Sequence, residues 1–466
     1  MVALAARLGI PPRLVGGVLL GTLLNPLNSS MIAVALVEMQ RHFDVGVATS
    51  TWLLSGFYLT AAIGQPLMGR LVDLFGARRL FVSGLALVLA VSVLAPFAPD
   101  FWWLVVLRAV QALGTSTAFP AALVIFRSAV PEGARPPSGA LAALGVTAAS
   151  SAALGPVIGG LLVAVAGWQA IFLVNVPLTI MGMLVAMAVL PAARPSARSA
   201  DPARPGLLAR LDVPGIVLFA ACVATLLGFL LSLAARPLWW LAPLTVGWGA
   251  ALTLRELRTP TPFLDVRGLA SGGALTSILV QQVTVTFVFY SLFFGLPMWL
   301  EAVRGLPTAQ VGPLLLPFTI MSLIVTPVAV RVIDRTGPRT VLVTGSFLVV
   351  LGTLLLQLLG DTTPIALLVL VTVVMGIPNG LNNLGLQTGL YAASPPESAG
   401  TAGGLFQTFR YLGAILAGSV LGILLERNLS SDGLHDVGLV IAIAAVGLVL
   451  LSLRLPRSLD RHGTGE

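Results

Sequence analysis

Two apolar segments of the chain, 273–300 and 364–390, carry polar side chains at every fourth position. The polar residues are Gln282, Thr286 and Tyr290 in the first segment and Asn379, Asn383 and Gln387 in the second. A spacing of four places each set on one face of a helix, and an amide cannot face hydrocarbon without a hydrogen-bonding partner. The two sets therefore either bond neighbouring helices or line a watery cavity, and we favour the cavity.

Arg108 and Arg410 are the charged side chains that lie well inside apolar segments. A charge inside a membrane span is costly and marks a functional candidate. Arg stays protonated at physiological pH, so Arg108 cannot carry a transported proton, although it can bind an anion or a carbonyl group. The carboxylates Glu38 and Glu301, which lie near segment ends, are the candidates for proton coupling.

The sequence lacks the residue sets that ATP use, metal binding or catalysis would need. It has no Gly-Lys-Ser/Thr phosphate loop, so we expect no use of ATP. Cys222 is the single cysteine, and His42, His435 and His462 are scattered, so we expect no metal, no cofactor and no catalysis. The alternative from another class, a membrane-embedded enzyme, would need a cluster of nucleophile, base or metal ligands at one depth.

The composition requires a lipid environment. The chain has 466 residues, 57% of them hydrophobic and 9% charged, with a mean hydropathy of +0.98. A soluble domain carries roughly a quarter charged residues, and apolar runs of about 20 residues favour membrane helices over a barrel. The net charge of +8 comes from Arg in short connections, so the partner is the bilayer and not nucleic acid.

Fourteen apolar spans are predicted along the chain. They lie at approximately 14–36, 49–69, 80–98, 101–126, 138–164, 168–191, 213–233, 237–254, 273–300, 309–330, 341–359, 364–390, 401–425 and 438–455. With both termini in the cytoplasm, 20 of the 26 Arg fall on the cytoplasmic side and four fall outside. Because cytoplasmic loops retain positive charge, this partition favours that orientation.

A ten-residue pattern occurs twice, at 69–78 and at 330–339. The first copy holds Gly69, Asp73, Gly76 and Arg78, and the second holds Asp334, Gly337 and Arg339 at the same spacing. Such a repeat predicts two parallel six-helix bundles. We assign them to 1–191 and 272–466, with cytoplasmic linkers and two extra membrane helices in 192–271.

At these residues the chain resembles the major facilitator superfamily, and most closely its fourteen-helix drug:proton antiporter branch. Similar motifs follow in the family's order over nearly the whole chain. They are the loop 69–78; Arg108, Gln111 and Gly114 in the fourth span; Gly155, Pro156, Gly159 and Gly160 in the fifth; 168–177 in the sixth; and 403–413 in the thirteenth.

The resemblance implies export of small lipophilic or amphipathic compounds by alternating access. The exporter is expected to be a monomer in the bacterial inner membrane, and the resemblance implies that protons drive it. The two loops would form a conformational latch, and the motif of the fifth span, which marks antiporters, would let that helix bend. Asn25 and Asn28 of the first span, with Arg410, join the candidates for the substrate cavity.

One position departs from the branch. The first span of that branch usually carries an Asp where this chain has Asn28, in the run Leu27-Asn28-Ser29-Ser30. An amide does not titrate near neutral pH, so the usual proton site is missing. The alternative in the same class is therefore an exporter of a lipid or a self-made metabolite, with weak or no proton coupling.

We expect reporter fusions placed in the 192–212 loop and at the C-terminus to report a cytoplasmic location, because the Arg partition puts both on that side. An enzyme reporter active only in the periplasm and one active only in the cytoplasm provide matched readings at each site. A periplasmic signal from either position would contradict the predicted topology.

Overall fold

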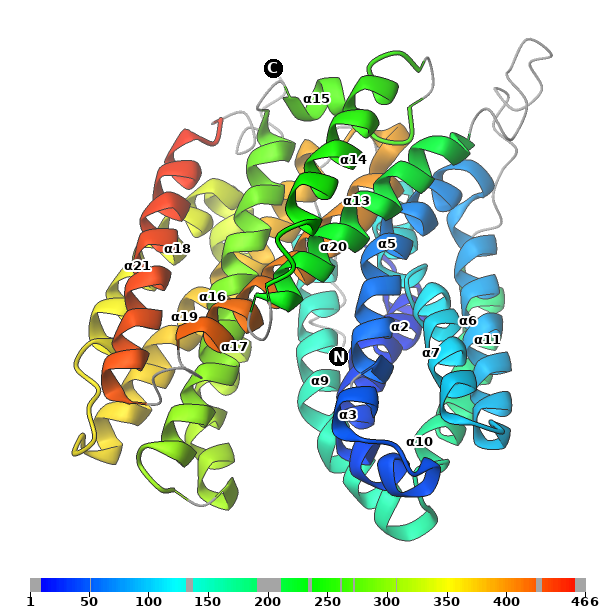
Figure 1. The fold of residues 1–466 in the computed structure, drawn as a ribbon. Helices are drawn as coiled ribbons and strands as arrows, with labels where there is room; N and C mark the ends of the chain where they lie inside the picture. The colour runs from blue at the N-terminus through cyan, green and yellow to red at the C-terminus, as the bar shows by residue number, and fades with distance from the viewer. Residues whose placement is uncertain are drawn as a thin grey trace, which may run out of the picture.

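The computed structural model is helical throughout its described residues (Figure 1), which are 10–50, 52–130, 137–190, 211–233, 237–259, 262–270, 273–306, 308–424 and 430–456. This architecture confirms the all-α part of the predicted fold class. The boundaries predicted between the domains, at 191/192 and 271/272, lie outside the described residues, as does most of the 192–212 linker.

The first helix group, which we call the first bundle, lies on one side of the molecule (Figure 1). Its elements are α2 (Pro12–Thr22), α3 (Leu24–Phe43), α4 (Val47–Ser50), α5 (Trp52–Phe75), α6 (Ala77–Leu94), η1 (Ala95–Phe97), α7 (Phe101–Thr115), α8 (Ala118–Ser128), α9 (Ser138–Ala166), α10 (Ala170–Leu173) and α11 (Asn175–Val189).

The second bundle follows a segment in which the structure gives the bounds of three helices. The intervening helices are α13 (Val213–Ser232), α14 (Leu241–Glu256) and α15 (Val266–Ala270). The second bundle consists of α16 (Ala274–Ala302), α17 (Thr308–Thr336), α18 (Pro338–Leu356), α19 (Ile365–Ala393), η3 (Pro396–Ser398), α20 (Ala399–Leu424) and α21 (Ser431–Arg454).

Twelve helices of the described chain are long and apolar enough to cross a membrane. The chain is therefore a multi-pass membrane protein, whereas the sequence predicts fourteen spans. The two predicted spans outside this set correspond to α5 and α14. α14 has only 16 residues, about 24 Å at 1.5 Å per residue, which is short for a hydrocarbon core about 30 Å thick.

The repeated loops adopt the same backbone turn. Gly76 has φ +92° and directly precedes α6, and Gly337 has φ +84° and directly precedes α18. Side chains strain the backbone at positive φ, which glycine adopts freely. The glycine shared by the two loops therefore reverses the chain between the second and third helices of each bundle.

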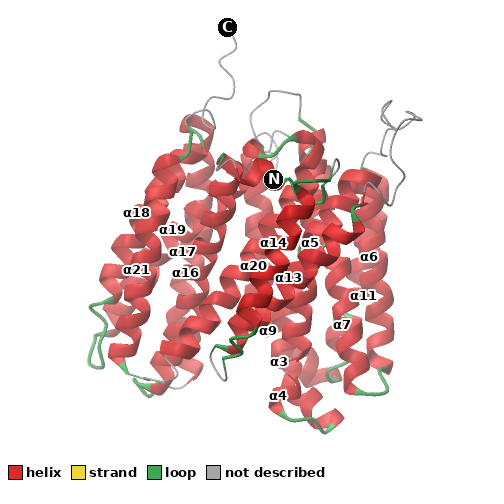
Figure 2. Cartoon of the chain, turned by 45° about the horizontal axis from the view of Figure 1, so that its top comes forward, coloured by secondary structure: helices red, strands yellow, loops and turns green. Residues whose placement is uncertain are grey.

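The bundles approach each other at one end and diverge at the other, where α4 lies (Figures 1 and 2). At the first end, which we call the closed end, α5 packs along α20 and α9 approaches α17 and α19. The backbones of Gly69 and Gly400 touch there, so a methyl group on either would clash with the other's carbonyl oxygen.

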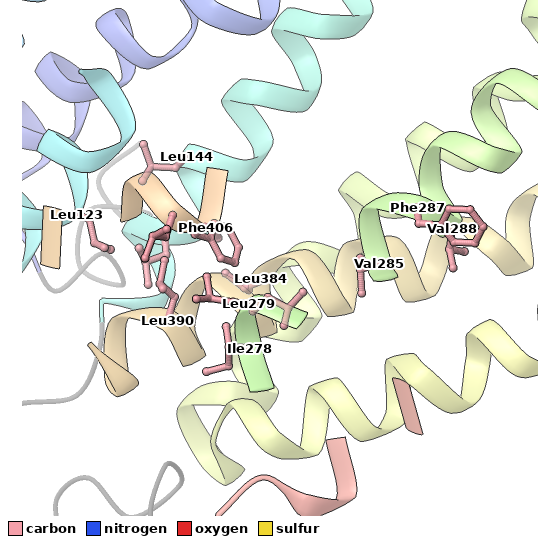
Figure 3. Packing of buried hydrophobic residues seen from close by; sticks show 14 of the residues in the cluster. Leu123, Leu144, Ile278, Leu279, Val285, Phe287, Val288, Leu384, Leu390 and Phe406 are labelled. Atoms are coloured by element: carbon pink, nitrogen blue, oxygen red, sulfur yellow. The ribbon is translucent and has the colours of Figure 1, made fainter. Parts of the chain in front are cut away.

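Apolar side chains seal the closed end. Figure 3 shows Leu123 and Leu144 of the first bundle beside Leu390 and Phe406 of the second. Each of these side chains is at most 5% exposed. The ring of Phe406 also stacks on that of Phe119, with centroids 5.9 Å apart. A continuous apolar layer therefore joins the bundles at this end.

The extra helix α13 lies across the contact between the bundles. It packs against α5 of the first bundle and α20 of the second, and the hydroxyl of Ser419 donates to the carbonyl oxygen of Leu230 at 2.6 Å. α13 and α14 also pack along each other. One side of the α5–α20 contact is therefore covered by protein.

Candidate functional site

A cavity of about 150 Å³ lies between the two bundles. The second bundle supplies most of its wall and α9 of the first bundle supplies the rest. The lining residues are Gly145, Ala148, Ala149, Ala152, Gln282, Val285, Thr286, Phe289, Tyr290, Phe293, Phe318, Thr319, Ser322, Asn379, Asn383 and Arg410.

Six of the residues singled out from the sequence share this cavity: Gln282, Thr286, Tyr290, Asn379, Asn383 and Arg410. Several also bond one another or their neighbours. The Gln282 amide donates to the Thr286 hydroxyl at 3.1 Å, and the Asn379 amide donates to Ser322 at 3.0 Å. Cavity lining and helix bonding, which the sequence presents as alternatives, therefore occur together.

Gln387, Asn25 and Asn28 do not line the cavity. Gln387 is 4% exposed and donates to Asn383 at 2.7 Å, one turn closer to the cavity. Asn25 donates to the Thr115 hydroxyl at 3.0 Å and accepts from the Tyr411 hydroxyl at 3.3 Å. Asn25 thereby links the first span to α20 of the other bundle.

Four aromatic rings form the apolar part of the cavity wall. Phe289 stacks on Phe293 with centroids 5.4 Å apart, and Phe318 lies 5.5 Å from Phe289. Tyr290 lies edge-on to Phe289 at 4.9 Å. The cavity therefore presents a flat apolar surface beside amides, a hydroxyl and a guanidinium group, as small-molecule sites do.

The small residues that α9 contributes are the part of the site that sequence reasoning missed. Gly145, Ala148, Ala149 and Ala152 face the cavity, at spacings of three and four that repeat on one helical face. Small residues also mark helix–helix contacts in membranes, so this pattern alone does not distinguish a cavity wall from packing.

The motif of the fifth span packs α9 against α3. A methyl group added at Gly155 would clash with Ser30 of α3, and one added at Gly159 would lie tightly against Met31, whereas Gly160 lies at ordinary contact distance from Val34. α9 continues through Pro156 as one helix of 29 residues. In this structure the motif brings two helices of one bundle close together.

Arg108 is fully buried in the first bundle, with an exposed fraction of 1%. Its Nη1 donates to Gln111 Oε1 at 2.6 Å, and the guanidinium lies 4.4 Å from the centroid of the Phe57 ring. The other nitrogens, Nε and Nη2, have no partner among the described residues. Gly114, the last residue of this motif, packs α7 against the backbone of Gly84 in α6.

Asn28 forms a reciprocal amide pair with Asn175 of α11. Each side chain donates to the other, at 2.9 and 2.8 Å, and Gln111 donates to Asn28 Oδ1 at 3.3 Å. Arg108, Gln111, Asn28 and Asn175 thus make one buried chain of hydrogen bonds with a single charge. The position of the usual acid is occupied by a neutral, fully bonded amide.

Asp73 joins the bundles at the closed end. Its carboxylate accepts from the backbone N–H groups of Gly400 and Thr401 and from the Thr401 hydroxyl, each at 2.8 Å. These N–H groups belong to the first turn of α20, where the helix dipole favours negative charge. The related Asp334 accepts from Ser138, the first residue of α9. Each acid thus reaches the fifth helix of the opposite bundle.

The two loop arginines act within their own bundles. Arg78 donates to the carbonyl oxygen of Met187 at 2.6 Å, near the end of α11, and Arg339 donates to that of Leu453 at 2.9 Å, near the end of α21. Arg127 instead crosses between bundles, donating to the carbonyl oxygens of Tyr391 and Ser394 at the end of α19.

The coupling candidates lie away from the cavity wall. Glu301 is the second-last residue of α16 and is exposed, and Glu38 is half-buried near the end of α3. Glu38 lies toward the divergent end, since α4 follows α3 there. Glu301 lies at the same end, because α16 starts after α15 at the closed end (Figure 1) and runs away from it. Neither carboxylate touches the buried chain that contains Arg108.

We expect Gln282→Cys, Asn379→Cys and Asn383→Cys, each in a Cys222→Ser background, to react with a water-soluble thiol reagent, because these side chains line the cavity. Leu384→Cys is the matched control, since Leu384 is 3% exposed on the same helix as two of the three, and it should stay unmodified. Mass spectrometry counts the adducts. Inertness at all three cavity positions would show that the amides only bond neighbouring helices.

Comparisons with known proteins agree with this architecture. The sequence profile of the Major Facilitator Superfamily matches residues 18–418. The chain is 37% identical to the uncharacterized MFS-type transporter YwoD of Bacillus subtilis (strain 168), over 93% of this chain and 94% of that protein. It is 30% identical to the tetracenomycin C resistance and export protein of Streptomyces glaucescens, over 94% and 83%.

The fold is also that of solved transporters. The crystal structure of the human organic anion transporter MFSD10 (TETRAN) matches with a TM-score of 0.68, covering 95% of this chain and all of that one. Sequence identity in this match is 15%, so the similarity concerns the fold alone. Profile, relatives and fold agree, and the chain belongs to the Major Facilitator Superfamily of membrane transporters.

Proposed function

We propose that the protein exports small lipophilic or amphipathic compounds from bacteria across the inner membrane by alternating access. The cavity carries this proposal, because it lies between the two bundles and combines aromatic rings with amides and one guanidinium group. Bundles that meet at one end and diverge at the other correspond to one state of a rocking transporter. The resistance and export proteins among the relatives support the outward direction.

Fourteen spans with cytoplasmic termini are part of this proposal. α5 and α14 supply the two spans beyond the twelve, since both run alongside spanning helices. Exposed tryptophans begin α5, α7 and α14: they are Trp52, Trp102, Trp103, Trp239 and Trp240. Because successive spans run in opposite directions, these tryptophans lie at the divergent end. Tryptophan is enriched where membrane helices meet the membrane–water interface. The closed end, which carries the loop arginines, is then cytoplasmic.

The two repeated loops are proposed to latch the cytoplasmic side shut. Asp73 and Asp334 bond the opposite bundle, so both contacts must break before that side opens. Arg78 and Arg339 tie each loop to the last helix of its own bundle, so the loop moves with that bundle. The latch would thereby stabilise the outward-facing state without locking it.

Proton coupling would have to use carboxylates near helix ends. Among the described residues, no Asp or Glu lines the cavity, and Asn28 takes the place of the usual acid. Glu38 and Glu301 remain the candidates, at the divergent end. We therefore propose export by a monomer whose rate depends weakly on pH.

Transport in inverted membrane vesicles tests the exporter and its latch together. We expect wild-type vesicles to accumulate amphipathic dyes, and Asp73→Asn to slow accumulation by about tenfold. Hydrogen bonds to a charged group contribute about 1.5–3 kcal/mol each, and about 1.4 kcal/mol is tenfold. Asp334→Asn, at matched protein levels, should slow it less, because its loop lacks the leading glycine. Wild-type rates for Asp73→Asn would remove the latch.

Replacing the neutral amide tests the missing proton site. We expect Asn28→Asp to make initial transport rates clearly more pH-dependent between pH 6 and 8, because a titratable group then lies beside the buried Arg108 network. Asn382→Asp is the control, since Asn382 is also buried, at 1% exposed against 3% for Asn28, but belongs to the other bundle. An unchanged pH profile for Asn28→Asp would show that this position plays no part in coupling.

A further inference from the structure

The charges inside the helical spans are all positive over the described residues. Arg108 is the central residue of α7, and Arg410 is the twelfth residue of the 26 in α20. Every described Asp and Glu instead lies in a connection or within about two turns of a helix end. In the part of the chain that the structure describes, the middle layer therefore holds two permanent cations and no carboxylate to neutralise them.

Arg410 is the charged residue of the cavity wall. Its side chain is half-buried, and within the described residues it makes no side-chain hydrogen bond and no ion pair. A guanidinium group has five N–H donors in a planar fork suited to carboxylate, sulfonate and phosphate. Arg410 therefore presents an unused anion-binding group to whatever occupies the cavity.

Arg108 adds positive charge from the opposite bundle. Two of its nitrogens lack partners although the residue is only 1% exposed. It lies against Phe57, the neighbour of Tyr58, whose ring is 5.8 Å from that of Tyr411 beside Arg410. A water-poor interior screens charges far less than water does. The positive potential of both arginines therefore extends into the space between the bundles.

The sign of this field selects among amphipathic compounds. Aromatic rings can attract a cation through their faces, and four rings line the cavity. A cationic compound, however, would meet Arg410 without any nearby carboxylate to offset the repulsion. An anion gains the charge-assisted bonds that Arg410 leaves unmade, and its apolar body gains the rings.

We propose that the exported compounds are amphipathic anions, each with a ring-containing apolar body and one carboxylate, sulfonate or phosphate that binds Arg410. This assignment rests on the proposed export function and names its substrate class. Asn379, Asn383 and Gln282 bond the remaining polar groups of the compound. Arg108 favours the same sign of charge from the first bundle.

An anionic substrate also accounts for the missing acid in the first span. The membrane potential, negative inside, favours the exit of an anion by about 2.3 kcal/mol per charge per 100 mV. Export of a monoanion can therefore proceed without a proton carrier in the middle of the membrane. With such a substrate, an amide at position 28 does not deprive export of its driving force.

A pair of dyes that differ only in charge tests the proposal. The two probes are a naphthalene sulfonate and the trimethylammonium compound on the same ring system, offered to inverted vesicles with a lumen-positive potential. A lumen-negative potential is applied for the cation, so that each probe is drawn inward. We expect wild-type vesicles to take up the sulfonate at least about tenfold faster than vesicles without the protein, and to discriminate against the cation.

Variants of Arg410 separate charge from folding. Arg410→Gln should reduce sulfonate uptake at least about tenfold, because a hydrogen bond to a charged group is lost. Arg410→Lys keeps the positive charge and should retain part of the sulfonate uptake. Arg410→Glu should lose the sulfonate and gain the trimethylammonium probe. Arg454→Gln, an exposed arginine at the end of α21, is the control and should behave as wild type.

The outcomes distinguish this proposal from the function on which it rests. Faster uptake of the cation than of the sulfonate by wild type, or sulfonate uptake unchanged in Arg410→Gln, would overturn the anionic assignment. Export of uncharged dyes alone would also overturn the anionic assignment. In each of these cases the exporter proposal stands. Failure to accumulate any dye, charged or uncharged, would contradict the exporter proposal itself.

Discussion

A polar group inside a bilayer has no water to bind, so the protein must supply its partner. This constraint organises the interior of the transporter. Asn28 and Asn175 satisfy each other as a reciprocal pair, and Gln111 connects that pair to Arg108. Polar groups left with unused bonding capacity, such as Arg410, are then the natural binding groups of the cavity.

The same constraint governs how the bundles meet. Helix ends leave backbone N–H groups without partners, and at the closed end Asp73 accepts from those of α20. The repeated loops apply one design twice: a glycine at positive φ turns the chain, an acid binds the opposite bundle, and an arginine binds its own. The contact between the bundles at this end thus consists of a few hydrogen bonds and an apolar layer.

The cavity unites features that would conflict elsewhere in a membrane. Aromatic rings accept an apolar body, two of the lining amides donate to neighbouring hydroxyls, and a guanidinium group supplies fixed charge. The absence of carboxylates from this layer of the described chain makes the charge uncompensated. Substrate charge and driving force are thereby connected, since an inside-negative potential moves anions outward.

The sequence by itself determined the membrane class, the helices, the repeated loops and the polar faces of α16 and α19, because periodicity and charge placement are local properties. The sequence assigned residues of the first span to the cavity, whereas Asn28 bonds Asn175 instead. It also missed the small residues of α9, such as Gly145. Only the tertiary structure decided these points, and it alone joined Asp73 to α20 across more than 300 residues. In a lipid environment the partner of a polar group is chosen by which helices pack together, and residue spacing does not encode that choice.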